Sequence, residues 1–163
     1  QFKSGPGVGE YSYLIGKNTS VYGSADMLMS RFIIGRTDAL DERELDEWAA
    51  TINRFQDAVT GLYVAAPFEP HSKEPAEMDT SDHEHTTAFA VAALALIGRR
   101  PTHRLTAMIA LQANRSRWEG WLANEPVYHS WDHRSSGVYA ALALTGALEP
   151  AFSSWWTISR WPC

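Results

Sequence analysis

The sequence is poor in cysteine, and this absence narrows the chemistry available to the protein. Its only cysteine is Cys163, at the last of 163 positions. A single cysteine forms no disulfide within the chain and supports no cysteine-based metal site. A chain without a disulfide framework is more typical of the cytoplasm than of an oxidising compartment, so we favour the cytoplasm and leave the compartment otherwise open.

Two further absences exclude classes of partner. No apolar run reaches the roughly 18 residues that a membrane-spanning helix requires, so we expect no membrane span. No run of basic residues occurs, and the 14 Lys and Arg residues are outnumbered by 19 Asp and Glu residues, which gives a net charge of −5. Because nucleic-acid-binding surfaces concentrate Lys and Arg, we expect no nucleic acid as a partner.

The apolar residues that are present follow a helical period. In the segment 41–56, Leu45, Trp48 and Ile52 recur at spacings of three and four residues, which places them on one face of a helix. We expect further helices over 25–34, 84–97, 102–123, 132–145 and from 151 onwards, and we find no long alternating pattern typical of strands. The sequence therefore predicts an all-α fold, with an irregular arm over 1–24 and a helical domain over 25–163.

Two of these segments nearly repeat each other. The stretch HTTAFAVAALALIG begins at His85, and HRSSGVYAALALTG begins 48 positions later at His133. Helices rich in Ala and Leu look alike by composition alone, but composition explains less well the leading histidine, the acid before it (Glu84 and Asp132) and the closing glycine. A repeat of this period is typical of stacked helical hairpins, in which neighbouring units bury the inner helix of each unit.

The residues before the first inner helix resemble a known repeat. Gln56-x-x-x-Thr60-Gly61-Leu62-Tyr63, followed by His85-Thr-Thr-Ala and a small-residue helix, is similar to the repeat of α/α-toroid proteins, most of all the terpenoid cyclase and protein prenyltransferase group. The resemblance implies repeated hairpins in a partial α/α toroid. Toroids that act on polysaccharides as hydrolases, lyases or epimerases look similar. The Asp-x-Asp-Asp motif of protonating cyclases and the Asp/Cys/His zinc set of prenyltransferases are both missing.

The chain offers two hairpins and the start of a third, and it begins at Gln1 rather than at Met. A closed toroid contains more hairpins than this. We therefore expect the chain to be part of a larger toroid, or a partial toroid that associates with another copy or with the missing remainder.

The candidate site residues precede the two inner helices. They are His83, Glu84 and His85 in the first segment, and His129, Asp132 and His133 in the second. If the hairpins stack in register, both groups stand on one rim. One interpretation makes the acids helix caps and the histidines partners of nearby carbonyls. A second makes His85 and His133 an acid/base pair oriented by Asp132 or Glu84. A third places zinc on His83, His85, His129 and His133; otherwise we expect no cofactor.

Neighbouring residues suggest the ligand. Asp82 lies at the mouth of the first inner helix, and Tyr63, Tyr128, Trp131 and Tyr139 lie in or beside the same rim segments, where aromatic faces bind sugar rings or shield a carbocation. The leading hypothesis is acid/base chemistry on a carbohydrate. The alternatives are isoprenoid cyclisation, with Asp82 as proton donor, and a non-catalytic helical scaffold that binds a partner protein.

Overall fold

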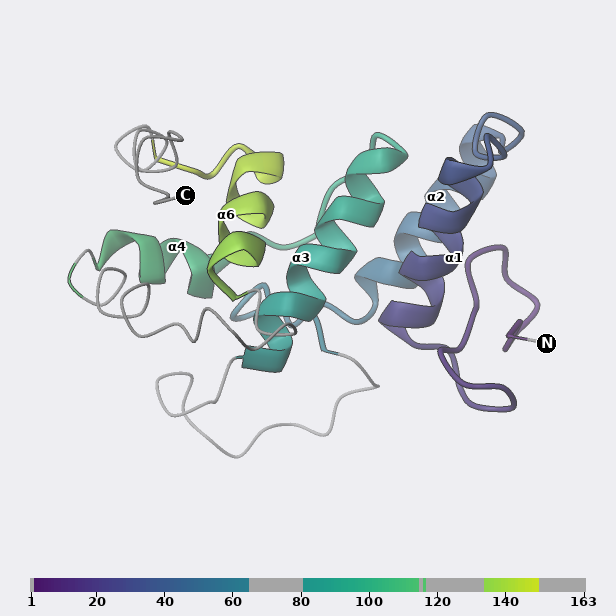
Figure 1. The fold of residues 1–163 in the computed structure, drawn as a ribbon, viewed down its shortest axis with the longest axis horizontal. Helices are drawn as coiled ribbons and strands as arrows, with labels where there is room; N and C mark the ends of the chain where they lie inside the picture. The colour runs from purple at the N-terminus through teal and green to yellow at the C-terminus, as the bar shows by residue number, and fades with distance from the viewer. Residues whose placement is uncertain (1, 65–80, 115, 117–133, 150–163) are drawn as a thin grey trace, which may run out of the picture.

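The computed structural model describes residues 2–64, 81–114, 116 and 134–149. Within these ranges the chain forms five helices: α1 (Val21–Ile33), α2 (Glu42–Asn53), α3 (Ser81–Leu96), α4 (Thr106–Ala113) and α6 (Arg134–Thr145) (Figure 1). The described residues contain no strand and only two isolated bridges, one of which joins Gln56 to Tyr63. The predicted all-α class is confirmed.

Three helices lie side by side and run in the same direction. In Figure 1, α3 lies between α1 and α6, with α2 behind α1. The starts of α3 and α6 meet where Gly137 faces Ala88, since a Cβ on Gly137 would lie 3.2 Å from that of Ala88. Their far ends meet as well, because the loop after α3 and the end of α6 line one pocket. The small residues at this contact allow the two helices to approach closely.

The three parallel helices end in the same way. Gly35, Gly98 and Gly146 follow α1, α3 and α6 with φ of 66°, 66° and 71°. Each glycine N–H donates to the carbonyl three residues back, and the next N–H donates to the carbonyl five residues back. This pattern closes a helix and favours glycine, because the left-handed backbone strains other residues. The two segments that match at an offset of 48 therefore share their ending in atomic detail.

The helix starts differ in part from the sequence prediction. We expected a helix over 25–34, but α1 begins at Val21 and its cap is Ser20, whose hydroxyl accepts from the N–H of Gly23. Here a local side-chain hydrogen bond decided the start ahead of the apolar pattern. Helix α2 begins with Asp41 and Glu44 in a reciprocal capping box, and its first turn is acidic as the helix dipole favours.

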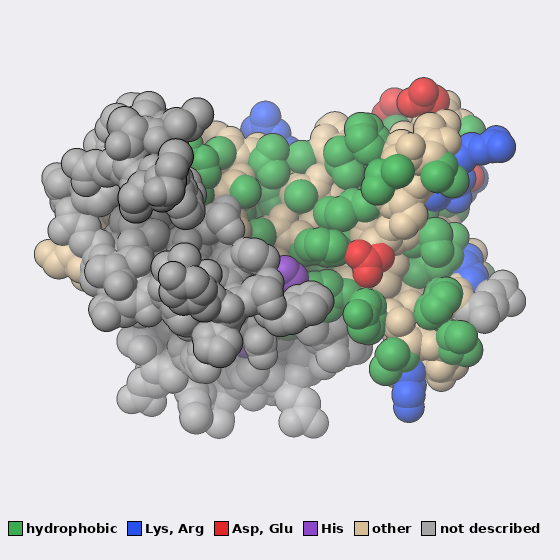
Figure 2. Space-filling model, in the orientation of Figure 1, with side chains coloured by type: hydrophobic (Ala, Val, Ile, Leu, Met, Phe, Trp, Pro, Cys, Tyr) green, Lys and Arg blue, Asp and Glu red, His purple; other side chains and the backbone are tan. Residues whose placement is uncertain are grey.

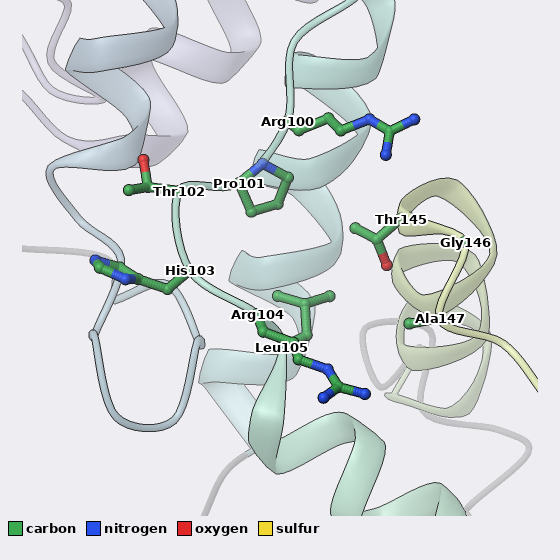
Figure 3. A pocket seen from close by; sticks show the side chains of 9 residues that line it. All are labelled: Arg100, Pro101, Thr102, His103, Arg104, Leu105, Thr145, Gly146 and Ala147. Carbon is green, nitrogen blue, oxygen red and sulfur yellow. The ribbon is translucent and has the colours of Figure 1, made fainter.

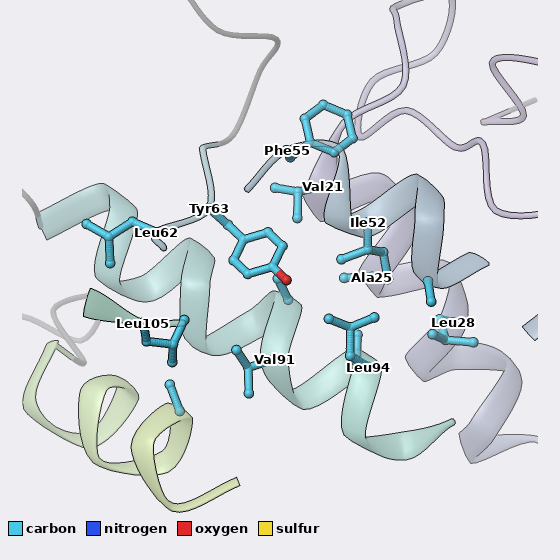
Figure 4. Packing of buried hydrophobic residues seen from close by; sticks show 14 of the residues in the cluster. Val21, Ala25, Leu28, Ile52, Phe55, Leu62, Tyr63, Val91, Leu94 and Leu105 are labelled. Carbon is cyan, nitrogen blue, oxygen red and sulfur yellow. The ribbon is translucent and has the colours of Figure 1, made fainter. Parts of the chain in front are cut away.

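The core joins α1, α2 and α3 around Trp48, which is fully buried and donates from Nε1 to the carbonyl of Ser24 at 3.2 Å. Tyr11 from the arm stacks on the Trp48 indole with ring centroids 5.7 Å apart. Figure 4 shows Tyr63 among the apolar side chains of these helices, including Ile52 and Leu94. Because large buried side chains carry about 3–5 kcal/mol each on truncation, this cluster dominates the stability of the described fold.

Two buried glutamines connect successive units. Nε2 of Gln56 donates to the carbonyls of Gly61 and His103 at 2.9 and 2.8 Å, and its Oε1 accepts from the N–H of His103 at 2.8 Å. Gln112, at the end of α4, makes a similar pair of hydrogen bonds. It donates to the carbonyl of Ala147 at 3.2 Å and accepts from the N–H of Glu149 at 2.9 Å. Each glutamine holds the loop that follows the next inner helix.

The inner helices are not covered on every side, contrary to our expectation from their apolar composition. Leu96 of α3 is 36% exposed, Leu144 of α6 is 48% exposed, and Ile33 occupies the corresponding place on α1 at 81%. Within the described residues, these three side chains have no protein layer in front of them. An apolar helix face left open in this way fits a ligand or another protein surface.

Candidate functional site

The open surface of α1, α3 and α6 forms one continuous helix face, which we call the inner-helix face. Its members are half-buried or exposed and recur at helical spacing: Tyr22, Asp26, Met29 and Ile33 on α1; His85, Phe89, Ala92 and Leu96 on α3; and Ala140, Ala143 and Leu144 on α6. Where described residues are visible in Figure 2, over α1 and α3, this side is largely hydrophobic, with an acidic and a histidine side chain among the apolar ones.

The polar residues of this face meet at its N-terminal end. The hydroxyl of Tyr22 lies 3.0 Å from Nδ1 of His85 and 2.7 Å from Oγ1 of Thr86. Tyr22 is the second residue of α1, while His85 and Thr86 lie in the first turns of α3. Because the two helices start side by side, these groups meet although 63 positions separate Tyr22 from His85.

Aromatic rings surround this hydrogen-bonded group. The His85 imidazole stacks against Phe89 with centroids 5.8 Å apart, and Tyr22 packs at a tilt against Phe89 at 5.7 Å. Tyr13 from the arm packs at a tilt against Tyr22 at 6.2 Å and is exposed. The result is an apolar wall with hydroxyl and imidazole groups at its edge, which suits a ligand that has both an apolar face and hydroxyl groups.

Two proton arrangements satisfy the contacts of Tyr22. In one, Nδ1–H of His85 donates to the Tyr22 oxygen, and the Tyr22 O–H donates to Oγ1 of Thr86, which leaves Nε2 as an acceptor. In the other, the Tyr22 O–H donates to Nδ1, and Nε2 carries the proton. An imidazole held in this way can accept a proton at Nε2 in the first arrangement and can donate a hydrogen bond from Nε2 in the second.

Asp26 adds a carboxyl group to the same face. It follows Tyr22 by four residues, which places both on one side of α1. Its side chain is half-buried, and desolvation by burial raises the pKa of its carboxyl above the ordinary value. A carboxyl that retains its proton to higher pH is a suitable general acid.

Tyr63, which the sequence suggests as a ligand-binding residue, lies in the core. It has no exposed surface, and its hydroxyl donates to Oδ1 of Asn53. Burial raises the pKa of its phenol. Its backbone N–H donates to Oγ1 of Thr87, which in turn donates to the carbonyl of His83. These contacts give Tyr63 a packing role and leave it out of the candidate site.

His83, Glu84 and His85 do not face one site. Residues two apart on a helix are separated by about 200°, so His83 lies away from the inner-helix face that His85 occupies. Glu84 is buried at the start of α3, on the side where Gly137 of α6 approaches. This geometry opposes a zinc site that uses both His83 and His85. The described part of the chain contains no group of three His, Cys, Asp or Glu residues suited to a metal ion.

The remaining predicted residues are only partly covered by the structure. Asp82 lies in the first turn of α3, but its side chain is outside the described residues. Tyr139 is half-buried on α6, seven residues before Gly146, which is the position that the buried Val91 and Leu28 hold before Gly98 and Gly35. The candidates His129, Asp132, His133, Tyr128 and Trp131 lie outside the described residues.

Sequence reasoning overlooked Tyr22, Asp26 and Phe89, although a signal for Tyr22 was present. Tyr22 precedes Gly35 by the same interval that separates His85 from Gly98 and His133 from Gly146. Aligning the three glycines places Tyr22 and His85 in the same position of neighbouring helices. Asp26 and Phe89 also share one position in this alignment, but residue type alone gave no reason to single them out.

No protein-family model, curated protein or solved structure matches this chain. Among the described residues, no helix combines the length and apolar character needed to cross a bilayer.

Proposed function

We propose that this chain is an α/α-toroid-type enzyme domain that acts on a carbohydrate by acid/base chemistry at the start of the inner-helix face. The observation that carries the proposal is the contact of the Tyr22 hydroxyl with Nδ1 of His85 at 3.0 Å, beside the ring of Phe89. The parallel helices with matching glycine ends support the toroid part, since hairpin repeats produce this arrangement.

The roles follow from the groups available. His85 moves a proton through Nε2, and Tyr22 contacts its Nδ1 and so orients the imidazole. Asp26, whose pKa burial raises, supplies the proton to a leaving oxygen. The rings of Phe89 and Tyr13 offer apolar surface to a sugar ring, whose C–H groups pack well on aromatic faces.

The test is an activity screen of the purified chain with matched variants. Soluble polysaccharides, neutral and uronic-acid-containing, are incubated with the protein, and new reducing ends and unsaturated uronic acids are measured. We expect His85→Ala to lower the rate by ~10²–10⁴-fold, as for loss of an acid/base group. Tyr22→Phe retains the ring and should lower the rate about 10-fold, as for loss of one hydrogen bond.

His103→Ala is the control, because His103 holds its loop through backbone atoms rather than through its imidazole. It should retain activity, and all three variants should retain their helical circular dichroism. An activity that survives in His85→Ala, or that His103→Ala removes equally, would contradict the assignment of His85.

A second candidate is an isoprenoid substrate, favoured by the apolar end of the inner-helix face. Ile33, Leu96 and Leu144 are exposed there, and they suit a hydrocarbon chain better than a polyol. In this case Asp26 replaces Asp82 as the proton donor, and the aromatic rings near Tyr22 steady a cation.

The two candidate substrates can be distinguished by variants at the apolar end of the face, because the sugar site lies at its other end. Leu96→Glu with Leu144→Glu should abolish turnover of a linear isoprenoid diphosphate while leaving polysaccharide activity within about twofold, since the sugar site lies beside His85. If no substrate of either class is turned over, and the apolar end instead binds a protein chain, the scaffold interpretation replaces both.

A further inference from the structure

A pocket lies away from the inner-helix face, at the far end of the parallel helices. Its volume is about 320 Å³, at the small end of the range for ligand pockets, ~300–1,000 Å³. It lies between the loop that follows α3 and the end of α6, and Pro101, Leu105, Thr145 and Ala147 are among its lining residues (Figure 3). Arg100 and Arg104 extend from the two ends of the loop toward α6.

The loop that carries these arginines is held in place by other parts of the fold. Nδ2 of Asn53 donates to the carbonyl of Arg100 at 3.1 Å, and Gln56 makes two hydrogen bonds to the backbone of His103. The N–H of Ala107 donates to the carbonyl of Thr60 at 2.9 Å. The pocket wall is thus formed before any ligand arrives, which lowers the entropic cost of binding.

The arginines of the loop differ in whether they form ion pairs. The guanidinium of Arg99 pairs with Glu42 at 2.6 Å and with Asp46 at 2.8 Å. Arg100 and Arg104 make no ion pair within the described ranges. The side chain of His103 points away from the pocket (Figure 3). Two cationic groups therefore flank one pocket in a chain whose net charge is −5.

A simpler role for these arginines would be to neutralise the C-terminal end of α6. Three carbonyls near that end already have partners: the N–H of Gly146 donates to Ala143 at 3.1 Å, that of Ala147 donates to Leu142 at 2.8 Å, and the hydroxyl of Thr145 donates to Ala141 at 2.8 Å. Because the helix end is closed by its own backbone and by Thr145, it does not require the guanidinium groups.

We propose that this pocket binds the oxyanion group, phosphate or carboxylate, of a small organic molecule. Arg100 and Arg104 contact the oxyanion, as guanidinium forks suit both groups, and Pro101 and Leu105 pack against the organic part. The site stands at the opposite end of α3 from Tyr22 and His85, so it is separate from the proposed reaction site.

The test is a titration of the isotope-labelled full-length chain by amide NMR at constant ionic strength. Inorganic phosphate and sodium acetate are the two probes. We expect saturable shifts at the amides of Leu105, Gly146 and Ala147, with a Kd on the order of 1 mM for the better probe. Shifts with phosphate alone identify a phosphate ligand, and comparable shifts with both probes identify the oxyanion in general.

The decisive variant is Arg100→Gln with Arg104→Gln, which should weaken binding about 10-fold or more while leaving the polysaccharide or isoprenoid activity unchanged. Lys17→Gln with Arg36→Gln is the control, since it removes the same charge from exposed positions outside the pocket. Absence of saturable shifts with either probe would overturn the proposal. Equal weakening in both double variants would also do so, because it would indicate attraction by overall charge.

Discussion

The two ends of α3 are held by different kinds of contact. At its start, side chains from separate segments meet, with Tyr22 on His85 and the backbone of Tyr63 on Thr87. At its end, the helix closes on its own backbone at Gly98, and Gln56 holds the following loop through main-chain atoms. The comparison indicates that the closing end is general scaffold, since the same glycine ending follows α1, α3 and α6. The starting end depends on residue identity and is therefore where chemistry can vary.

The largest effect is predicted for a substitution at Gly61, which packs against the loop that follows the end of α3. Its φ is +74°, and an added Cβ would overlap the carbonyl of Arg104. We expect Gly61→Ala to destabilise the fold by about 3–5 kcal/mol in urea unfolding, because backbone strain and backbone overlap add. Gly16→Ala is the control: its φ is also +74° with nothing within 4 Å, so it should cost only ~1 kcal/mol. Equal losses in the two variants would refute the close approach.

The next prediction compares the two glutamine bridges. Gln56→Ala removes three hydrogen bonds and leaves buried backbone groups unsatisfied, so we expect a loss of about 2–4 kcal/mol. Gln112→Ala removes two and should cost about 1–3 kcal/mol. Urea unfolding of both variants gives the comparison. A larger loss for Gln112→Ala would show that the second hairpin, rather than the first, anchors the fold.

A smaller loss of stability is expected for a substitution near the start of α3. Thr87→Val retains the shape of the side chain but removes the acceptor for the Tyr63 N–H, at 2.8 Å, and the donor to the carbonyl of His83. We expect a loss of about 1–2 kcal/mol in thermal or urea unfolding. Thr106→Val is the matched control, since that threonine is exposed at the start of α4 and its loss should stay within about 0.5 kcal/mol.

The smallest effect concerns pH and Asp26. Because burial raises the pKa of its carboxyl in the folded state, the folded chain binds this proton more tightly than the unfolded chain. Stability therefore falls as the pH rises from the ordinary aspartate range through the raised pKa, and Asp26→Asn should remove this fall. Because solvent screens a half-exposed carboxylate, Asp26→Asn should raise the free energy of unfolding at neutral pH by only about a few tenths of a kcal/mol. Urea unfolding midpoints of both proteins from acidic to neutral pH measure it; identical profiles would contradict the burial of Asp26.

The sequence predicted the helical elements well where the pattern was local. The acidic first turn of α2 and the glycine ends at Gly35, Gly98 and Gly146 are visible in the sequence, and the structure has both. The start of α1 was placed four residues late because a serine cap at Ser20 precedes the apolar pattern. The candidate site was predicted only through His85, since Tyr63 proved to be a core residue and Tyr22 was missed. The toroid and its ligand remain proposals.

The sequence by itself determined which segments are helices and where they close, because helical periodicity, caps and glycine ends are properties of neighbouring residues. Only the tertiary structure decided which faces stay open and which polar groups meet. The Tyr22–His85 contact joins residues 63 positions apart, and the exposure of Leu96 depends on what packs against it. Contacts between distant residues and the exposure of a side chain depend on how whole helices pack. A local sequence pattern does not contain that information.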